Sequence, residues 1–120
     1  MKTAVDPLEI PFRAPVDDAL IARLVERILE TRPCTCIVLF GSQAYGQPTA
    51  DSDVDLLIVS EGAEETFKVA AELYYALSPR DFGIDLVVMT PAKFHERRKK
   101  FDPFFQEITT KGHVLYGALP

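Results

Sequence analysis

Three short apolar runs, rich in β-branched residues, constrain the fold of this chain more than any other feature of its sequence. They occupy residues 34–40, 54–60 and 84–89, and the first is apolar on both sides, as a buried central strand would be. About ten residues separate the first run from the second, which is too few for a usual parallel crossover but enough for an antiparallel neighbour. About two dozen residues, mostly helical in pattern, separate the second run from the third and suit a right-handed parallel crossover. The end of the first strand and the starts of the other two should therefore meet at one edge of the sheet.

Apolar residues at helical spacing fill the rest of the chain. The pattern predicts helical segments over residues 17–31, 63–78, 92–100 and 101–108. A short last strand is predicted over residues 113–116. Asp17 or Asp18 suits the N-cap of the first helix, and Pro33 prevents its continuation. Thr90 and Pro91 suit the start of the third helix as N-cap and first helical residue. The sequence thus predicts an α/β (α+β) fold, a small mixed β-sheet with helices packed on it.

The length of 120 residues fits one domain with a core of its own. Prolines space out residues 1–16, which we expect to form an N-terminal arm ahead of a domain over 17–120. No apolar stretch approaches a membrane span or a leader segment, so cytoplasm is the expected compartment. The net charge of −5 argues against a dedicated nucleic-acid binder. The basic run at 97–100 is typical of a solvated helix face.

The two cysteines, Cys34 and Cys36, lie two residues apart in the first apolar run. In a strand they would point to the same side of the sheet. Neighbouring positions on one face rarely supply disulfide geometry, and a metal site would need further ligands nearby. We therefore expect buried free thiols.

Small and acidic residues gather where the three strands should meet. Gly41 and Ser42 follow the first strand, Asp53 and Asp55 share one face at the start of the second, and Asp85 lies near the start of the third. Taken singly, a Gly-Ser pair is most often a turn, and an Asp-x-Asp is most often a solvated loop edge. Asp85 is more unusual because it interrupts an otherwise apolar strand, where a charge needs a partner or a cleft.

Three carboxylates at one edge need either protons or cations. Two like charges about 4 Å apart repel by roughly 4 kcal/mol at an effective dielectric near 20. Mg²⁺ prefers carboxylate oxygens and commonly shares them with substrate phosphates. Gly41 would permit close approach of a phosphate, Ser42 offers a hydroxyl, and a helical turn starting there would present backbone N–H groups. This arrangement predicts phosphoryl-type transfer assisted by two metal ions.

The spacing resembles the signature of the polymerase-beta-like nucleotidyltransferase superfamily, most closely its minimal nucleotidyltransferase branch. That signature is Gly-Ser, ten intervening residues and Asp-x-Asp, which stand here as Gly41-Ser42 and Asp53-Val54-Asp55. A later strand with a lone acid, Asp85, also agrees, and the resemblance covers roughly residues 18–117. It implies that Asp53 and Asp55 bridge two Mg²⁺ ions, while Asp85 binds one of them and helps to remove the acceptor's proton. Gly41 and Ser42 would then hold the triphosphate.

The resemblance also implies an activity and a partner. The chain would transfer a nucleoside monophosphate, AMP from ATP, to a hydroxyl. Many small stand-alone members look like antitoxins of HEPN-domain ribonuclease toxins and modify a tyrosine of the toxin. Members often carry an Arg where this chain has Tyr45, which is the third residue expected to contact the nucleotide. Two alternatives stay open: an antitoxin that acts by complex formation without catalysis, and transfer to a small-molecule hydroxyl such as that of an antibiotic.

Overall fold

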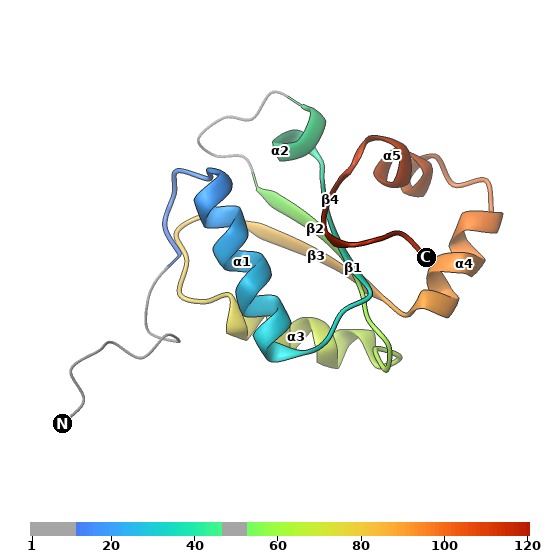
Figure 1. Ribbon diagram of the computed structural model, residues 1–120, viewed down its shortest axis with the longest axis horizontal. Helices are drawn as coiled ribbons and strands as arrows, with labels where there is room; N and C mark the ends of the chain where they lie inside the picture. Colours follow the sequence, from blue (N-terminus) through green and yellow to red (C-terminus); the bar gives the residue numbers. More distant parts are fainter. Residues whose placement is uncertain (1–11, 47–52) are drawn as a thin grey trace.

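The computed structural model describes residues 12–46 and 53–120, in which helices and strands alternate along most of the chain (Figure 1). In chain order the elements are α1 (Asp18–Thr31), β1 (Cys36–Phe40), α2 (Ser42–Tyr45), β2 (Val54–Val59), α3 (Thr66–Ala76), β3 (Ile84–Met89), α4 (Pro91–Lys99), α5 (Pro103–Lys111) and β4 (His113–Gly117). Every predicted strand and helix is present. Their order and type confirm the predicted α/β (α+β) class.

The strands form one mixed sheet in the order β3-β2-β1-β4. β1 is antiparallel to both β2 and β4, whereas β2 and β3 are parallel and are joined through α3. These directions are the ones that the lengths of the connections predict. The register places Phe40 opposite Asp55 and Val54 opposite Ile84. The end of β1 and the starts of β2 and β3 therefore lie at the same edge of the sheet, as expected.

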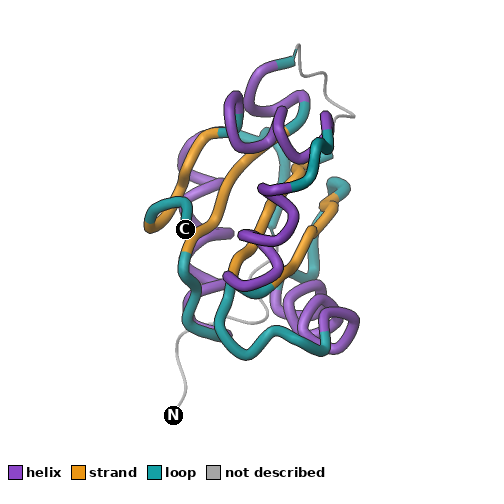
Figure 2. Tube along the Cα trace, turned by 90° about the vertical axis from the view of Figure 1, so that its right-hand side faces the viewer, coloured by secondary structure: helices purple, strands orange, loops and turns teal. Residues whose placement is uncertain are grey.

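Helices cover both faces of the sheet (Figure 2). One buried cluster fills the space between the sheet, α1 and α3, and includes Leu24, Ile58 and Leu73. A second cluster lies between the other face, α4 and α5, and includes Leu57, Phe94 and Phe105. Successive residues of β2 alternate between the two clusters because side chains of a strand point to opposite faces. Asp55 is two residues before Leu57 in the strand, so its side chain lies on the same face, which α4 and α5 cover.

Side-chain caps fix the starts of α1, α4 and α5. Asp17 accepts a hydrogen bond of 2.8 Å from Leu20 N at the start of α1, and Thr90 accepts one of 3.1 Å from Lys93 N at the start of α4. Both caps agree with the prediction. Asp102 caps α5 and also forms an ion pair of 2.6 Å with Arg97. Part of the basic run at 97–100 therefore ties α4 to α5, which the expectation of a solvated face did not include.

Two features differ from expectation. Cys34 and Cys36 are free thiols as predicted, but Cys34 packs against the first cluster and Cys36 lies in the second. The expectation that they share one side is wrong, because β1 begins only at Cys36 and the chain before it is not extended as a strand. Within the expected N-terminal arm, Phe12 is 1% exposed and pairs with Arg80, so this end of the arm belongs to the core. Residues 1–11 lie outside the described part of the chain.

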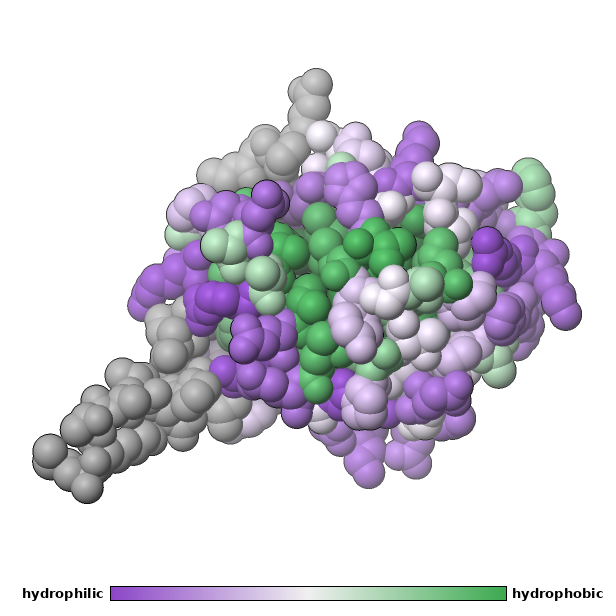
Figure 3. All heavy atoms as spheres, viewed as in Figure 1, coloured by the Kyte–Doolittle hydropathy of each residue, from purple (hydrophilic) through white to green (hydrophobic). Residues whose placement is uncertain are grey.

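One stretch of the surface is markedly apolar. Figure 3 shows apolar side chains gathered at the centre of the face drawn in Figure 1, where β4 forms one edge of the sheet. Val114 and Tyr116 of this strand are exposed. No helix within residues 12–46 and 53–120 is both long and apolar enough to cross a membrane.

Candidate active site

The turn after β1 depends on Gly41. Its backbone adopts φ 74° and ψ −158°, a region that only glycine occupies readily. The Gly41 carbonyl then accepts hydrogen bonds from Ala44 N at 3.0 Å and from Tyr45 N at 3.1 Å, which starts α2 at Ser42. A Cβ at Gly41 would overlap Oδ2 of Asp55. The turn thus brings the backbone directly against the Asp55 carboxylate, whereas its role as a phosphate turn stays a prediction.

Asp55 and Asp85 form the centre of the site. They are direct partners in the parallel pairing of β2 and β3, so their side chains lie on the same face. Asp55 is half-buried and Asp85 is exposed. Burial raises the pKa of Asp55 from 3.8 to about 6, and the neighbouring charge of Asp85, a side-chain hydrogen bond with Asp85 and the charge of Asp53 add to this effect. A proton on Asp55 therefore relieves the repulsion between the two side chains below about pH 6.

Asp53 lies slightly apart from this pair. It precedes β2, is exposed, and its carboxylate occupies the space where a side chain of Gly83 would be. A Cβ at Gly83 would overlap Asp53 Oδ1, and Gly83 O accepts a hydrogen bond of 2.9 Å from Val54 N. Gly83 is a site residue that sequence reasoning missed. The signal that was available is a glycine two residues before Asp85, directly ahead of the strand.

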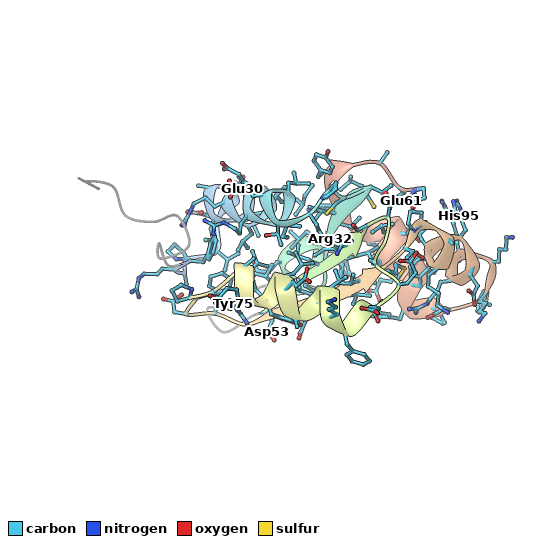
Figure 4. All side chains as sticks on the ribbon, turned by 90° about the horizontal axis from the view of Figure 1, so that it is seen from below. Glu30, Arg32, Asp53, Glu61, Tyr75 and His95 are labelled. Atoms are coloured by element: carbon cyan, nitrogen blue, oxygen red, sulfur yellow. The ribbon has the colours of Figure 1, made fainter. Side chains whose placement is uncertain are left out.

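The other two predicted residues, Ser42 and Tyr45, belong to α2, which follows the turn at Gly41. Ser42 begins α2 and is half-buried. Tyr45 ends α2 and packs against the second core cluster, so its ring helps to fill the space next to β1. The roles of Ser42 and Tyr45 in nucleotide binding stay predictions. His95, by contrast, lies far from Asp53 at the other end of the sheet (Figure 4).

The donor set suits a hard divalent cation. In the described part of the chain, no three His, Cys, Asp or Glu side chains are already drawn together as a metal cage. Asp55 and Asp85 nevertheless supply two adjacent carboxylates, and the charge of Asp53 is near enough to raise the pKa of Asp55. Mg²⁺ typically takes one or two carboxylates and completes its shell with water and substrate phosphates. These residues therefore fit Mg²⁺.

Comparison with solved structures shows the same fold in a protein proposed to be a nucleotidyltransferase and in two toxin–antitoxin complexes. A protein from Sulfolobus solfataricus proposed to be a nucleotidyltransferase is 20% identical, with a TM-score of 0.58 over 82% of this chain and 78% of that one. A toxin–antitoxin complex with AMP-PNP is 24% identical, with a TM-score of 0.53 over 79% and 71%. A mutant of the toxin–antitoxin pair MntA–HpeT is 22% identical, with a TM-score of 0.51 over 86% and 75%.

No curated protein matches the chain in sequence. The family model of the nucleotidyltransferase domain, however, matches residues 21–115, which run from within α1 to within β4. That span includes the turn at Gly41 and all three acids. The chain belongs to the nucleotidyltransferase domain family.

Proposed function

We propose that the chain transfers AMP from ATP to a tyrosine hydroxyl of a HEPN-type toxin and thereby acts as its antitoxin. The observation that carries the transfer step is the Asp55–Asp85 pair facing the turn at Gly41. Similarity to two toxin–antitoxin structures, one of them with AMP-PNP, supports the choice of partner and nucleotide.

Each residue of the site has a part in this reaction. The backbone of the turn at Gly41 and the Ser42 hydroxyl would hold the triphosphate, because a glycine lets a phosphate approach the chain closely. Mg²⁺ held by Asp53, Asp55 and Asp85 would neutralise the phosphate charge and make the acceptor hydroxyl more acidic. Asp85, the more exposed member of the pair, would take the proton of that hydroxyl. The acceptor oxygen forms a bond to the α-phosphorus, the bond to the β-phosphate breaks, and pyrophosphate leaves.

The direct test is transfer of label. The purified chain, ATP labelled in the α-phosphate, Mg²⁺ and the protein encoded by the adjacent gene are incubated together, and the labelled product is digested and sequenced by mass spectrometry. We expect AMP on one tyrosine of the partner. Absence of label on the partner with each of the four nucleoside triphosphates would overturn the proposal.

Complex formation without catalysis is the second candidate. Tyr45 favours it, since this residue stands where related proteins often have a phosphate-binding Arg and instead packs against the core. A guanidinium can hold a phosphate through two hydrogen bonds, which tyrosine cannot do. Full protection of cells from the toxin by Asp53→Asn, together with an intact complex, would favour this candidate. We expect loss of protection instead.

Gly83→Ala is expected to lower the transfer rate about a hundredfold, because the new methyl group would displace the Asp53 carboxylate. Gly83 does not have a positive φ, so the backbone itself accepts alanine. The unfolding midpoint should stay close to that of the parent chain, while the Mg²⁺ concentration for half-maximal rate rises. In an Asp53→Ala background, Gly83→Ala should leave the Mg²⁺-induced rise of the midpoint unchanged. An unaltered Mg²⁺ requirement in the single variant would contradict this role for Gly83.

A further inference from the structure

Two neighbouring aromatic residues of α5 have different surroundings. Phe105 is 3% exposed and belongs to the second core cluster, whereas Phe104 is 51% exposed. Of these two side chains, only Phe105 completes the core. The Phe104 ring nevertheless has one fixed contact: it meets the ring of Phe40 at a centroid distance of 5.8 Å and an interplanar angle of 84°.

The contact with Phe40 brings Phe104 to the side of the site. Phe40 is the last residue of β1 and the direct partner of Asp55, which is in turn the partner of Asp85. These three residues form a row across neighbouring strands on the face that α5 covers. Strands in a sheet lie about 4.8 Å apart, so Phe104 flanks the carboxylates from the β1 side. Figure 1 shows α5 beside this end of β1.

The backbone that carries Phe104 is well anchored. Pro103 starts α5, and Asp102 accepts hydrogen bonds from Phe104 N at 3.0 Å and from Phe105 N at 3.3 Å. The ion pair of Asp102 with Arg97 ties this helix start to α4. An aromatic ring that is held in place and left half in water is suited to bind a flat apolar partner.

We propose that Phe104 is the stacking surface for the base of the nucleotide donor. This inference rests on the proposed transfer of AMP and adds where the base lies, on the α5 side of the acids. The triphosphate at Gly41 and a base on Phe104 would then lie along one line at the end of β1. Every base has a π-face that can stack on an aromatic ring. Phe104 would therefore supply affinity for a nucleoside but no specificity for one base over another.

The test compares two ligands that differ by the nucleoside. Calorimetry in the presence of Mg²⁺ measures binding of AMP-PNP and of inorganic tripolyphosphate to the full chain. Phe104→Ala should weaken AMP-PNP about tenfold, which equals about 1.4 kcal/mol, and leave tripolyphosphate unchanged. Phe104→Leu keeps an apolar contact with Phe40 and should lose most of the same affinity, whereas Phe104→Trp should retain it.

Phe101→Ala is the matched control, because Phe101 is 89% exposed in the same segment and should not alter either affinity. Equal weakening of both ligands by Phe104→Ala would overturn the proposal, since it would indicate a disturbed phosphate turn. Unchanged affinity for AMP-PNP would also overturn it. The proposal would also be overturned if Phe104→Ala raised only the Michaelis constant for the protein acceptor, because Phe104 would then belong to the acceptor interface. A parent chain that binds neither ligand would contradict the proposed function itself, and this inference with it.

Discussion

Asp55→Asn is expected to reduce nucleotide transfer by about a thousandfold, equivalent to about 4 kcal/mol of transition-state stabilisation. Asparagine keeps the size of the side chain next to Gly41 but removes the negative charge that a cation requires. The measurement is the single-turnover rate with saturating Mg²⁺ and ATP. Glu72→Gln is the matched control, because Glu72 is an exposed acid of α3 on the opposite side of the sheet and should leave the rate unchanged.

The same substitution should make the metal-free chain more stable above pH 6. In the parent chain the pKa of Asp55 is raised by the fold, from 3.8 to about 6. The folded state therefore favours the protonated carboxyl, and this contribution is complete below pH 3.8 and is lost as the pH rises through about 6. A change of this size would correspond to about 3 kcal/mol, but Asp55 is only half-buried, and solvent screening reduces our expectation to about 1 kcal/mol.

Thermal unfolding in EDTA checks the stability effect. At pH 8 we expect Asp55→Asn to raise the midpoint by about 4 °C, and at pH 4 the difference from the parent chain should nearly vanish. Mg²⁺ should raise the midpoint of the parent chain and have a much smaller effect on the variant. A variant that is less stable at pH 8, or one that transfers nucleotide at the parent rate, would contradict the assignment of Asp55 to the centre of the site.

Gly41→Ala is expected to lower the free energy of unfolding by about 3 kcal/mol and to abolish transfer. Two costs add: alanine is strained at φ 74° and ψ −158°, and its methyl group would overlap Asp55 Oδ2. Urea unfolding measures the first effect and the single-turnover rate the second. Gly62→Ala is a useful control because Gly62 also has a positive φ, of 81°, but a Cβ there would meet only Arg32 Nη2 at 3.7 Å.

The control separates strain from overlap. Gly62→Ala should show a backbone cost of about 1–2 kcal/mol without loss of transfer. In an Asp55→Ala background, the stability cost of Gly41→Ala should fall toward that of Gly62→Ala, since the overlapping carboxylate is gone. Equal costs of Gly41→Ala in both backgrounds would show that Asp55 does not limit the space at this turn.

The sequence predicts this fold well because its strongest signals are local. Apolar runs, helix caps and the lengths of connections determine strand order and direction, and strand parity then brings Asp55 next to Asp85. The features that the sequence does not predict depend on contacts between residues that are far apart in the chain. Phe12 joins the first core cluster through its pairing with Arg80, and the space for a side chain at Gly83 is taken by Asp53.

The aromatic segment illustrates the same limit. Phe101, Phe104 and Phe105 are chemically alike, and helical spacing alone does not say which of them faces the sheet. The exact start of α5 at Pro103 decides it, by placing Phe105 inward and leaving Phe104 against the end of β1. The prediction that Cys34 and Cys36 share one face of the sheet is wrong for a related reason. β1 begins only at Cys36, so the alternation of side chains along the strand does not determine the direction of Cys34.

β2 and β3 carry their acids at one end and their connecting helices at the other. Asp55 and Asp85 are the second residues of six-residue strands, so about 16 Å separates them from the turns that lead into α3 and α4. Sequence drift or insertions in those turns would therefore reshape one end of the surface without moving a single carboxylate. A chain built in this way can vary that end during evolution while its acids stay in place.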